Sequence, residues 1–241
     1  MIVATTFDQK GYEIYGQRWI DSVIKYFPST TKVILYIDFE IKNLPSNFQI
    51  ISFNKNFKQY QYKLKNLLAK KFENTTEKNN IIAQKTFQFS YKGFVINNEL
   101  INKRDKMFIW LDGDVETISK IDQNSIDKIL DNKFLACQTE KQRYKYPHIE
   151  SGILIFDTTK PEIELFQKEL FNYYTTDNLY SLKKPYDGYI IGKILVDNGL
   201  SFKDFNSNIL TIGKKSRKDE TFLHPFLQKH FIHWIGENKT N

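Results

Sequence analysis

Two aspartates separated by one glycine follow an unbroken apolar stretch of the chain. Asp112, Gly113 and Asp114 come directly after the five apolar residues 107–111. That stretch has the length and composition of a strand buried on both faces of a parallel sheet. Open α/β sheets bind ligands beyond the carboxyl ends of their strands, and two carboxylates there suit a hard divalent cation. Aspartate and glycine are also common in turns, so the motif alone leaves both interpretations open.

A histidine late in the sequence offers a third candidate ligand. His233, Gly236 and Lys239 lie at intervals of three residues. Imidazole suits Mn²⁺ better than Mg²⁺, glycine lets backbone approach a phosphate, and lysine supplies a positive point charge. The same residues could instead pack or be solvated, and their spacing does not decide.

Two further polar groups stand at the starts of apolar segments. Glu150 and Ser151, with Gly152, enter an apolar run, where they could hold sugar hydroxyls or simply form a turn. Asp187 stands at the start of a helical pattern, where it could meet a donor sugar or an acceptor, or cap the helix.

Hydrophobic periodicity predicts an alternation of strands and helices around these residues. Apolar runs predict strands over 1–5, 32–38, 48–53, 107–111, 134–137 and 152–156. Helical spacing and terminal signals predict helices over 15–26, 58–72, 85–103 and 122–131, one opening at Pro161, and one ending at Asn198 and Gly199. Polar stretches predict loops over 6–12, 74–80 and 139–150. The pattern indicates an α/β fold with a central, mainly parallel sheet.

Composition favours one soluble domain with an anionic ligand. The 241 residues are 41% hydrophobic, and 35 basic against 28 acidic residues leave a net charge of +7. This balance fits nucleoside diphosphates, phosphorylated acceptors, nucleic acid or a lipid surface. The single cysteine, Cys137, lies in an apolar run and cannot form an internal disulfide. Without a signal-peptide pattern or an apolar stretch of about 20 residues, we expect a soluble, cytoplasmic protein with no transmembrane segment.

The sequence lacks the motifs that are typical of several other enzyme classes. The sequence has no phosphate-binding loop of the nucleotide triphosphatases and no Gly-x-Gly-x-x-Gly after its first strand. With one cysteine it has no Cys/His zinc pattern, and it has no Gly-x-Ser-x-Gly elbow.

The features together resemble the GT-A-fold glycosyltransferases, a superfamily of nucleotide-diphospho-sugar transferases. The short first strand, the following Thr-rich loop and residues 110–114 look like the nucleotide-binding part of that fold. Residues 150–156 resemble its polar-Ser/Thr-Gly element before an apolar strand. His233-x-x-Gly236-x-x-Lys239 is similar to the C-terminal motif of glycogenin-type retaining enzymes, although Thr240 and Asn241 stand where those have Pro-Trp.

The resemblance implies one Rossmann-like GT-A domain over residues 1–241. Its nucleotide-binding half would cover about 1–114 and its acceptor-binding half about 115–241. The implied activity is metal-dependent transfer of a sugar, of hexosyl type, from a nucleoside-diphosphate sugar to an acceptor hydroxyl. A UDP- or GDP-sugar would be the donor, and a saccharide or glycoconjugate the acceptor.

The resemblance also implies roles on the donor side. Backbone around Ala4, Thr5 and Thr6 would hold the base and ribose, with Gly113 beside the nucleotide sugar. Lys92, on the helix ahead of the apolar strand, could reach the donor.

Metal and diphosphate would be held by the two distant motifs. Asp112, Asp114 and His233 would bind Mn²⁺ or Mg²⁺, while Gly236 and Lys239 would bind the diphosphate. The metal and the lysine would neutralise charge on the leaving nucleoside diphosphate.

The sugar and acceptor would meet the remaining polar residues. Glu150, Ser151, Gly152 and Asp187 would line their site, with Asp187 as the base if the enzyme inverts. Retention needs no such base, and the His233 motif leans that way. Tyrosines of the loop 139–149 could stack on an acceptor sugar.

Three rival functions remain to be weighed. A sugar nucleotidyltransferase typically has a Gly-rich basic loop after its first strand, which residues 6–12 do not form. A non-enzymatic nucleic-acid-binding protein should interleave basic residues with stacking aromatics, whereas these aromatics mostly follow core spacing. A two-carboxylate glycoside hydrolase would need neither His233 nor a metal. We therefore expect no nucleic-acid partner.

Overall fold

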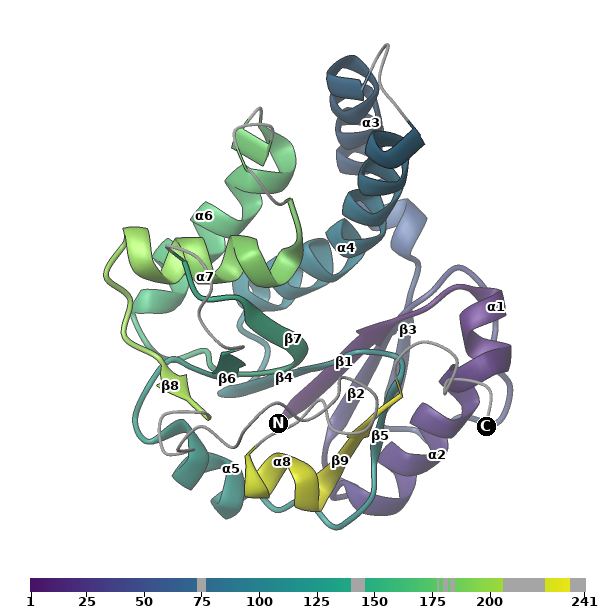
Figure 1. Cartoon of the computed structure of the whole chain (residues 1–241). Coiled ribbons are helices and arrows are strands. Elements are labelled where there is room, and N and C mark those ends of the chain that lie inside the picture. Colours follow the sequence, from purple (N-terminus) through teal and green to yellow (C-terminus); the bar gives the residue numbers. More distant parts are fainter. Residues whose placement is uncertain are drawn as a thin grey trace.

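A seven-stranded sheet between two layers of helices forms the centre of this computed structural model (Figure 1). The structure describes residues 1–72, 77–139, 146–176, 178, 179, 182, 185–205 and 224–234, and for 71, 72 and 77–83 only the backbone. The strand order is β3-β2-β1-β4-β7-β6-β8. The bounds are β1 Ile2–Thr6, β2 Lys32–Tyr36, β3 Phe48–Ile51, β4 Met107–Leu111, β6 Leu135–Thr139, β7 Ile149–Asp157 and β8 Lys203–Asp204.

Most strand pairs in the sheet are parallel. β1 pairs in parallel with β2 and with β4, β2 pairs in parallel with β3, and β6 with β8. The exception is β7, which runs antiparallel to β4 and β6. The predicted α/β class with a mainly parallel sheet is confirmed, and one sheet runs through both halves of the chain.

Both faces of the central strands are buried. All five residues of β4 are buried, which explains why its sequence is apolar without interruption. Alternate side chains enter opposite cores: Trp110 packs in the core on one face, and Ile109 in the core on the other. The carboxyl end of β4 therefore emerges from packing that fixes its position on both sides.

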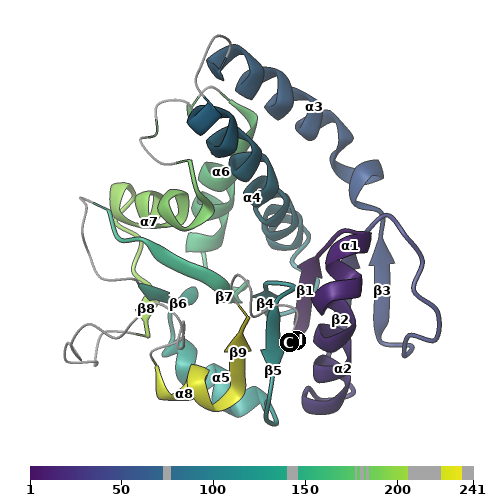
Figure 2. The same ribbon diagram turned by 45° about the vertical axis from the view of Figure 1, so that its right-hand side comes forward.

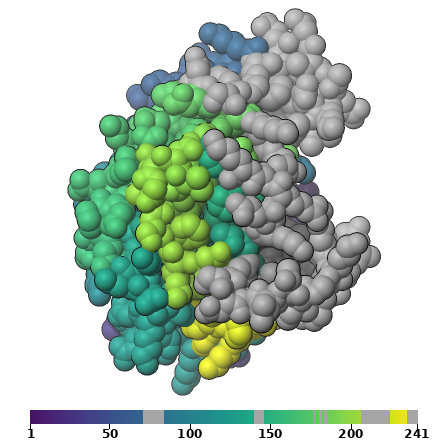
Figure 3. All heavy atoms as spheres, turned by 60° about the vertical axis from the view of Figure 1, so that its left-hand side comes forward, coloured from purple at the N-terminus to yellow at the C-terminus, as the bar shows by residue number. Residues whose placement is uncertain are grey.

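Helices cover the two faces unequally (Figures 1 and 2). One face carries α3, α4, α6 and α7, and the other carries α2, α5 and α8. The bounds are α1 Gln9–Gly11, a π-helical turn η1 Tyr12–Gly16, α2 Gln17–Tyr26, α3 Phe53–Phe72, α4 Glu77–Asn102, α5 Gln123–Leu130, α6 Glu162–Thr175, α7 Asp187–Asp197 and α8 Pro225–His230. In Figure 3, the yellow-green segment that includes α7 and β8 lies on the surface of the molecule, beside the green and teal segments.

Helix ends follow the predicted signals in two places. Asp122 caps α5, because its carboxylate accepts from Ser125 N at 2.9 Å. After α7, Gly199 takes a φ of +60°, the left-handed conformation that ends many helices. Cys137 is buried, as expected. Among the described residues, no helix is long and apolar enough to span a membrane.

Three predicted loops are shorter than the sequence suggested. Residues 9–12 are helical, because the Asp8 carboxylate accepts from Gly11 N at 2.6 Å and so starts a helix directly after β1. The backbone of α4 begins at Glu77, within the predicted loop 74–80. The loop 139–150 loses both ends, since Thr139 belongs to β6 and pairs with Ile149 of β7.

The predicted third strand also ends early. Phe53 is the first residue of α3, because the Asp38 carboxylate accepts from Ser52 Oγ and from Asn54 N, both at the start of that helix.

Candidate active site

The turn after β4 is packed on both sides. Asp112 N donates to Gly152 O of β7 at 2.8 Å, and Val115 N donates to Asp112 O at 2.9 Å. A Cβ on Gly113 would lie 3.0 Å from ring atoms of both Phe7 and Tyr15. A larger residue there would press on both rings, so the two aspartates project from a closely packed turn.

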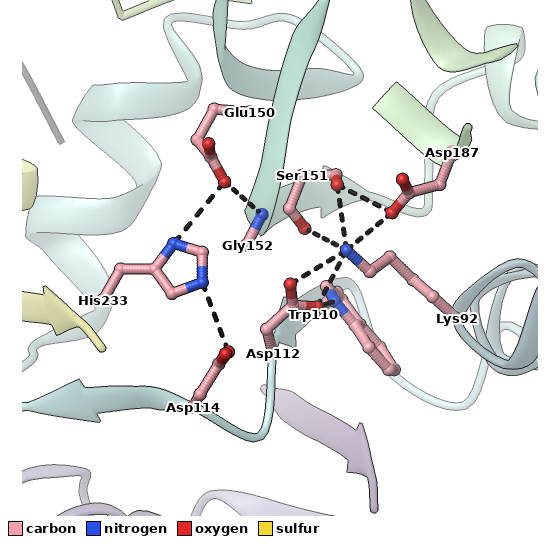
Figure 4. A network of polar contacts seen from close by, with 9 residues as sticks. All are labelled: Lys92, Trp110, Asp112, Asp114, Glu150, Ser151, Gly152, Asp187 and His233. Carbon is pink, nitrogen blue, oxygen red and sulfur yellow. Dashed lines mark hydrogen bonds and ion pairs between the residues drawn. The ribbon is translucent and has the colours of Figure 1, made fainter. Parts of the chain in front are cut away.

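A two-stranded ribbon brings His233 to this turn. β5 (Val115–Thr117) pairs antiparallel with β9 (Phe231–His233), and Val115 lies opposite His233. Trp234 N continues the pairing by donating to Asp114 O at 3.0 Å. His233 Nε2 lies 3.2 Å from Asp114 Oδ1 (Figure 4). One ligand atom each of Asp112, Asp114 and His233 lies within 4.8 Å of the others, so the sequence's three metal candidates converge.

Gly152 and Glu150 hold the other side of the imidazole. A Cβ on Gly152 would stand 2.8 Å from His233 Cε1, so the ring rests directly on that glycine. Glu150 Oε1 accepts from Gly152 N at 3.1 Å and lies 3.6 Å from His233 Nδ1. His233 thus stands between Asp114 and Glu150 (Figure 4).

Each of these two residues has a shifted pKa. Burial lowers the pKa of His233, but the hydrogen bond and negative charge of Asp114 outweigh it, so the pKa is raised. Burial raises the pKa of Glu150, and the nearby histidine opposes this only in part.

A buried lysine joins the remaining polar residues. Lys92 Nζ reaches from α4 to Asp112 Oδ1 at 2.8 Å, Asp187 Oδ2 at 2.7 Å and Ser151 Oγ at 2.9 Å. Ser151 Oγ in turn donates to Asp187 Oδ2 at 2.7 Å. Trp110 Nε1 donates to Asp112 Oδ1 at 2.6 Å. Four chain segments therefore meet in one charge network beside the metal candidates (Figure 4).

The pKa values of the two aspartates beside Lys92 are shifted in opposite directions. Burial would raise the pKa of Asp187, but the charge and hydrogen bond of Lys92 hold that pKa below its ordinary value. At Asp112 burial prevails over Lys92 and the pKa is raised, with Asp114 adding to the effect. Burial would lower the pKa of Lys92, but the two carboxylates raise it. The lysine is therefore charged and holds Asp187 ionised.

Comparison with known proteins identifies the fold. No protein-family model matches the sequence, and no curated protein matches it. Among solved structures, the bifunctional glycosyltransferase WbbM matches over 80% of this chain with a TM-score of 0.51 and 14% sequence identity. The chain has a GT-A-like glycosyltransferase fold. It spans 37% of the length of WbbM.

Two further glycosyltransferase structures match less well. GlyE of Streptococcus pneumoniae has a TM-score of 0.47 at 14% identity, over 81% of this chain and 43% of GlyE. Mouse xyloside xylosyltransferase 1 has a TM-score of 0.44 at 12% identity, over 83% of both chains.

The residues predicted to bind the donor differ from one another in where the structure places them. Thr6 ends β1, and its carbonyl oxygen lies 3.5 Å from where a Cβ of Gly113 would be. Ala4 and Thr5 are fully buried inside the strand, and Ala4 pairs with strands on both sides. Gly236 and Lys239 lie outside the described residues.

The acceptor-side candidates show two differences from expectation. Glu150 and Ser151 lie inside β7, not in a loop before it. Asp187 is the first residue of α7 and Tyr186 is the cap, so the carboxylate of Asp187 is used by Lys92 and Ser151. Tyr146 is buried, with its ring edge-on to Tyr189 of α7. Residues 140–145, with Tyr144, lie outside the described residues.

Two residues of the site were missed from the sequence. Trp110 stands two residues before Asp112, and side chains two apart in a strand point the same way, so its indole could have been foreseen at the site. Tyr15 lies against Gly113, and burial, together with the charge of Asp114, raises its pKa to about 12. It sits on the π-helical turn, a local geometry that helical spacing alone does not reveal.

Proposed function

We propose that the chain is a metal-dependent glycosyltransferase that moves a sugar from a nucleoside-diphosphate sugar to an acceptor hydroxyl. The observation that carries the proposal is the convergence of Asp112, Asp114 and His233 at the carboxyl end of β4 in a GT-A-like sheet. This is the edge at which open α/β sheets bind ligands. The likeness to the solved structure of the glycosyltransferase WbbM supports sugar transfer as the reaction class.

The residues present fit a divalent cation. Two carboxylates and an imidazole offer hard oxygen ligands and one borderline nitrogen, a set that suits Mn²⁺ and, less well, Mg²⁺. Asp114 and His233 already lie 3.2 Å apart, so a cation could replace the proton between them. Asp112 is partly occupied by Trp110 and Lys92, which leaves Asp114 and His233 as the main ligands we propose. When bound, the cation would neutralise charge on the leaving diphosphate.

The network around Lys92 would orient the sugar. We propose that Ser151 and Asp187 accept hydrogen bonds from sugar hydroxyls, since Lys92 keeps the aspartate ionised. A carboxylate held in this way is a poor proton acceptor, because a general base needs a pKa near the operating pH. Glu150, with its raised pKa, is the better candidate for proton transfer. We propose a retaining outcome, which needs no base on the acceptor; Glu150 would act as the base only if the enzyme inverts.

The nucleotide would lie over the ends of β1 and β4. Thr6 and Gly113 are adjacent there, and we propose that their backbone meets the base and ribose of a UDP- or GDP-sugar. Gly236 and Lys239 would complete the diphosphate site, with a saccharide or glycoconjugate as acceptor. The nucleotidyltransferase alternative is not favoured, because that class typically has a Gly-rich loop after its first strand. Here β1 is followed by the helical turn Gln9–Gly11.

The test is ligand-dependent thermal stability. At a ligand concentration near 100 times Kd, binding stabilises the fold by about 2.7 kcal/mol. For a chain of this size that raises Tm by roughly 5–10 °C. We expect Mn²⁺ with UDP or GDP to give such a shift, Asp114→Asn to lose it, and Asp127→Asn, at an exposed site on α5, to keep it. An unchanged shift in Asp114→Asn would remove this residue from the site, and sugar transfer that survives EDTA would refute metal dependence.

A further inference from the structure

Helix α3 forms the outer side of an arm that projects from the sheet. The arm is the pair α3 and α4, whose helices pack against each other (Figures 1 and 2). α3 begins just past the end of β3, at the carboxyl edge of the sheet. Lys92 of α4 contacts Asp112 at that edge, whereas α4 begins at Glu77, fifteen residues earlier. At 1.5 Å per residue, the arm extends about 22 Å beyond the candidate site.

Nearly all of the net charge of the chain lies on α3. This helix contains six of the 35 basic residues, all of them lysines, and none of the 28 acidic residues. The rest of the chain carries 29 basic and 28 acidic residues, so α3 accounts for six of the seven net positive charges. Such concentration on 20 residues is a local feature and does not follow from the overall composition.

The lysines cover the face of α3 that points away from the core. Phe53, Phe57, Leu64 and Leu68 are buried on the inner face. The lysines with described side chains are all exposed: Lys55, Lys58, Lys63, Lys65 and Lys70. At about 100° per residue, Lys55 and Tyr62 point directly away from the buried face, and Lys58, Lys63 and Lys70 flank them. Lys65 lies at the side of the helix next to α4, with its ammonium 5.2 Å from the centroid of the Phe87 ring. Tyr62 is 68% exposed, so an exposed tyrosine lies among the lysines of this face.

We propose that α3 docks on a membrane surface that is rich in anionic phospholipids. Lysines near an anionic leaflet are attracted to it without specific pairing, and the exposed lysines of one helix act together. Tyrosine is favoured at the membrane–water interface, where its ring is in apolar surroundings and its hydroxyl is hydrated. A helix of about 30 Å on the outside of the arm presents this charge to a flat surface. The proposal stands on α3 alone and does not depend on sugar transfer.

A nucleic acid is the less suitable anionic partner. Arginine, with its bidentate fork, is the preferred residue for phosphate recognition, and α3 has no arginine. Single-stranded nucleic acids also need several stacking aromatics, whereas Tyr62 is the one exposed aromatic among the described side chains of α3.

Vesicle flotation of the full chain tests the proposal. The vesicles are neutral phosphatidylcholine, or phosphatidylcholine and phosphatidylglycerol at about 7:3. We expect binding to the anionic vesicles only, with loss of binding as salt rises, because screening shortens the reach of surface charge. Replacing the five exposed lysines of α3 by glutamine should weaken this binding by about tenfold or more.

A control variant removes the same charge elsewhere. It replaces five exposed lysines of the body by glutamine: Lys32, Lys42, Lys120, Lys128 and Lys168. It should keep binding within about twofold, and circular dichroism should show both variants folded, since all ten side chains are exposed. Equal binding by the two variants, or no binding of the wild-type chain to anionic vesicles, would overturn the proposal. So would tighter binding to an oligonucleotide that displaces the vesicles.

Discussion

Replacing Lys92 by methionine should destabilise the fold strongly, because it leaves Asp112 and Asp187 buried without their shared positive partner. The Lys92 and Asp187 side chains are each 9% exposed, and that of Asp112 is 23% exposed. Breaking a buried ion pair by removing one partner costs about 3–5 kcal/mol. For a chain of this size, each kcal/mol lowers Tm by about 2–4 °C, so we expect a fall of roughly 6–20 °C.

Two variants make this experiment decisive when Tm and urea unfolding are measured at neutral pH. Lys103→Met is the matched control, since Lys103 is 43% exposed and lies 3.0 Å from an exposed glutamate, so its loss should cost less than about 1 kcal/mol. Adding Asp187→Asn to Lys92→Met should recover part of the loss, because one uncompensated charge is removed. If Lys92→Met costs no more than Lys103→Met, or if the second substitution recovers nothing, the lysine does not neutralise these carboxylates.

Two further substitutions test the surroundings of the site and the core. Gly152→Ala should weaken Mn²⁺ binding by about tenfold in calorimetry with the fold intact, because its Cβ would stand 2.8 Å from His233 Cε1 and displace the ring; unchanged affinity would contradict this contact. Glu99 accepts from Tyr36 Oη, and burial raises its pKa, so its stabilising contribution is complete below the ordinary carboxyl pKa and is lost as pH rises through the raised value. Glu99→Gln should therefore gain in Tm relative to the wild type as the pH rises above about 4, the ordinary pKa of glutamate, and a constant Tm difference would refute the shift.

The fold could be predicted because its signals are local. The apolar run 107–111 forms a strand buried on both faces. Asp122 starts a helix and Gly199 follows the end of one, as their residue types predict. Errors fell where side chains altered an element boundary. Asp8 starts a helix directly after β1, and Glu150 becomes part of β7 through pairing with Gln138.

The sequence predicted residues of the candidate site but not the contacts between them, because those contacts join distant parts of the chain. The sequence marked Asp112, Asp114 and His233, but their meeting depends on the β5–β9 ribbon, whose two strands have three residues each and weak local signals. That Lys92 reaches a donor stays a prediction. The structure adds that its ammonium pairs with two aspartates, which lie 20 and 95 residues further along the chain and which no local pattern indicates as its partners. A sequence pattern indicates which polar residues lie at strand ends, but it does not indicate which of their charges neutralise one another.

The β5–β9 ribbon also ties the site to the order in which the chain is made. Six strands of the large sheet are complete by Asp157, so that much of it can pair while the ribosome is still adding residues. The imidazole arrives only with His233, and it reaches Asp114 only when β9 docks beside β5. A nascent or truncated chain that ends before β9 would hold the two carboxylates without the imidazole beside them. The three side chains of the candidate site therefore come together only after all seven strands of the large sheet have been synthesised.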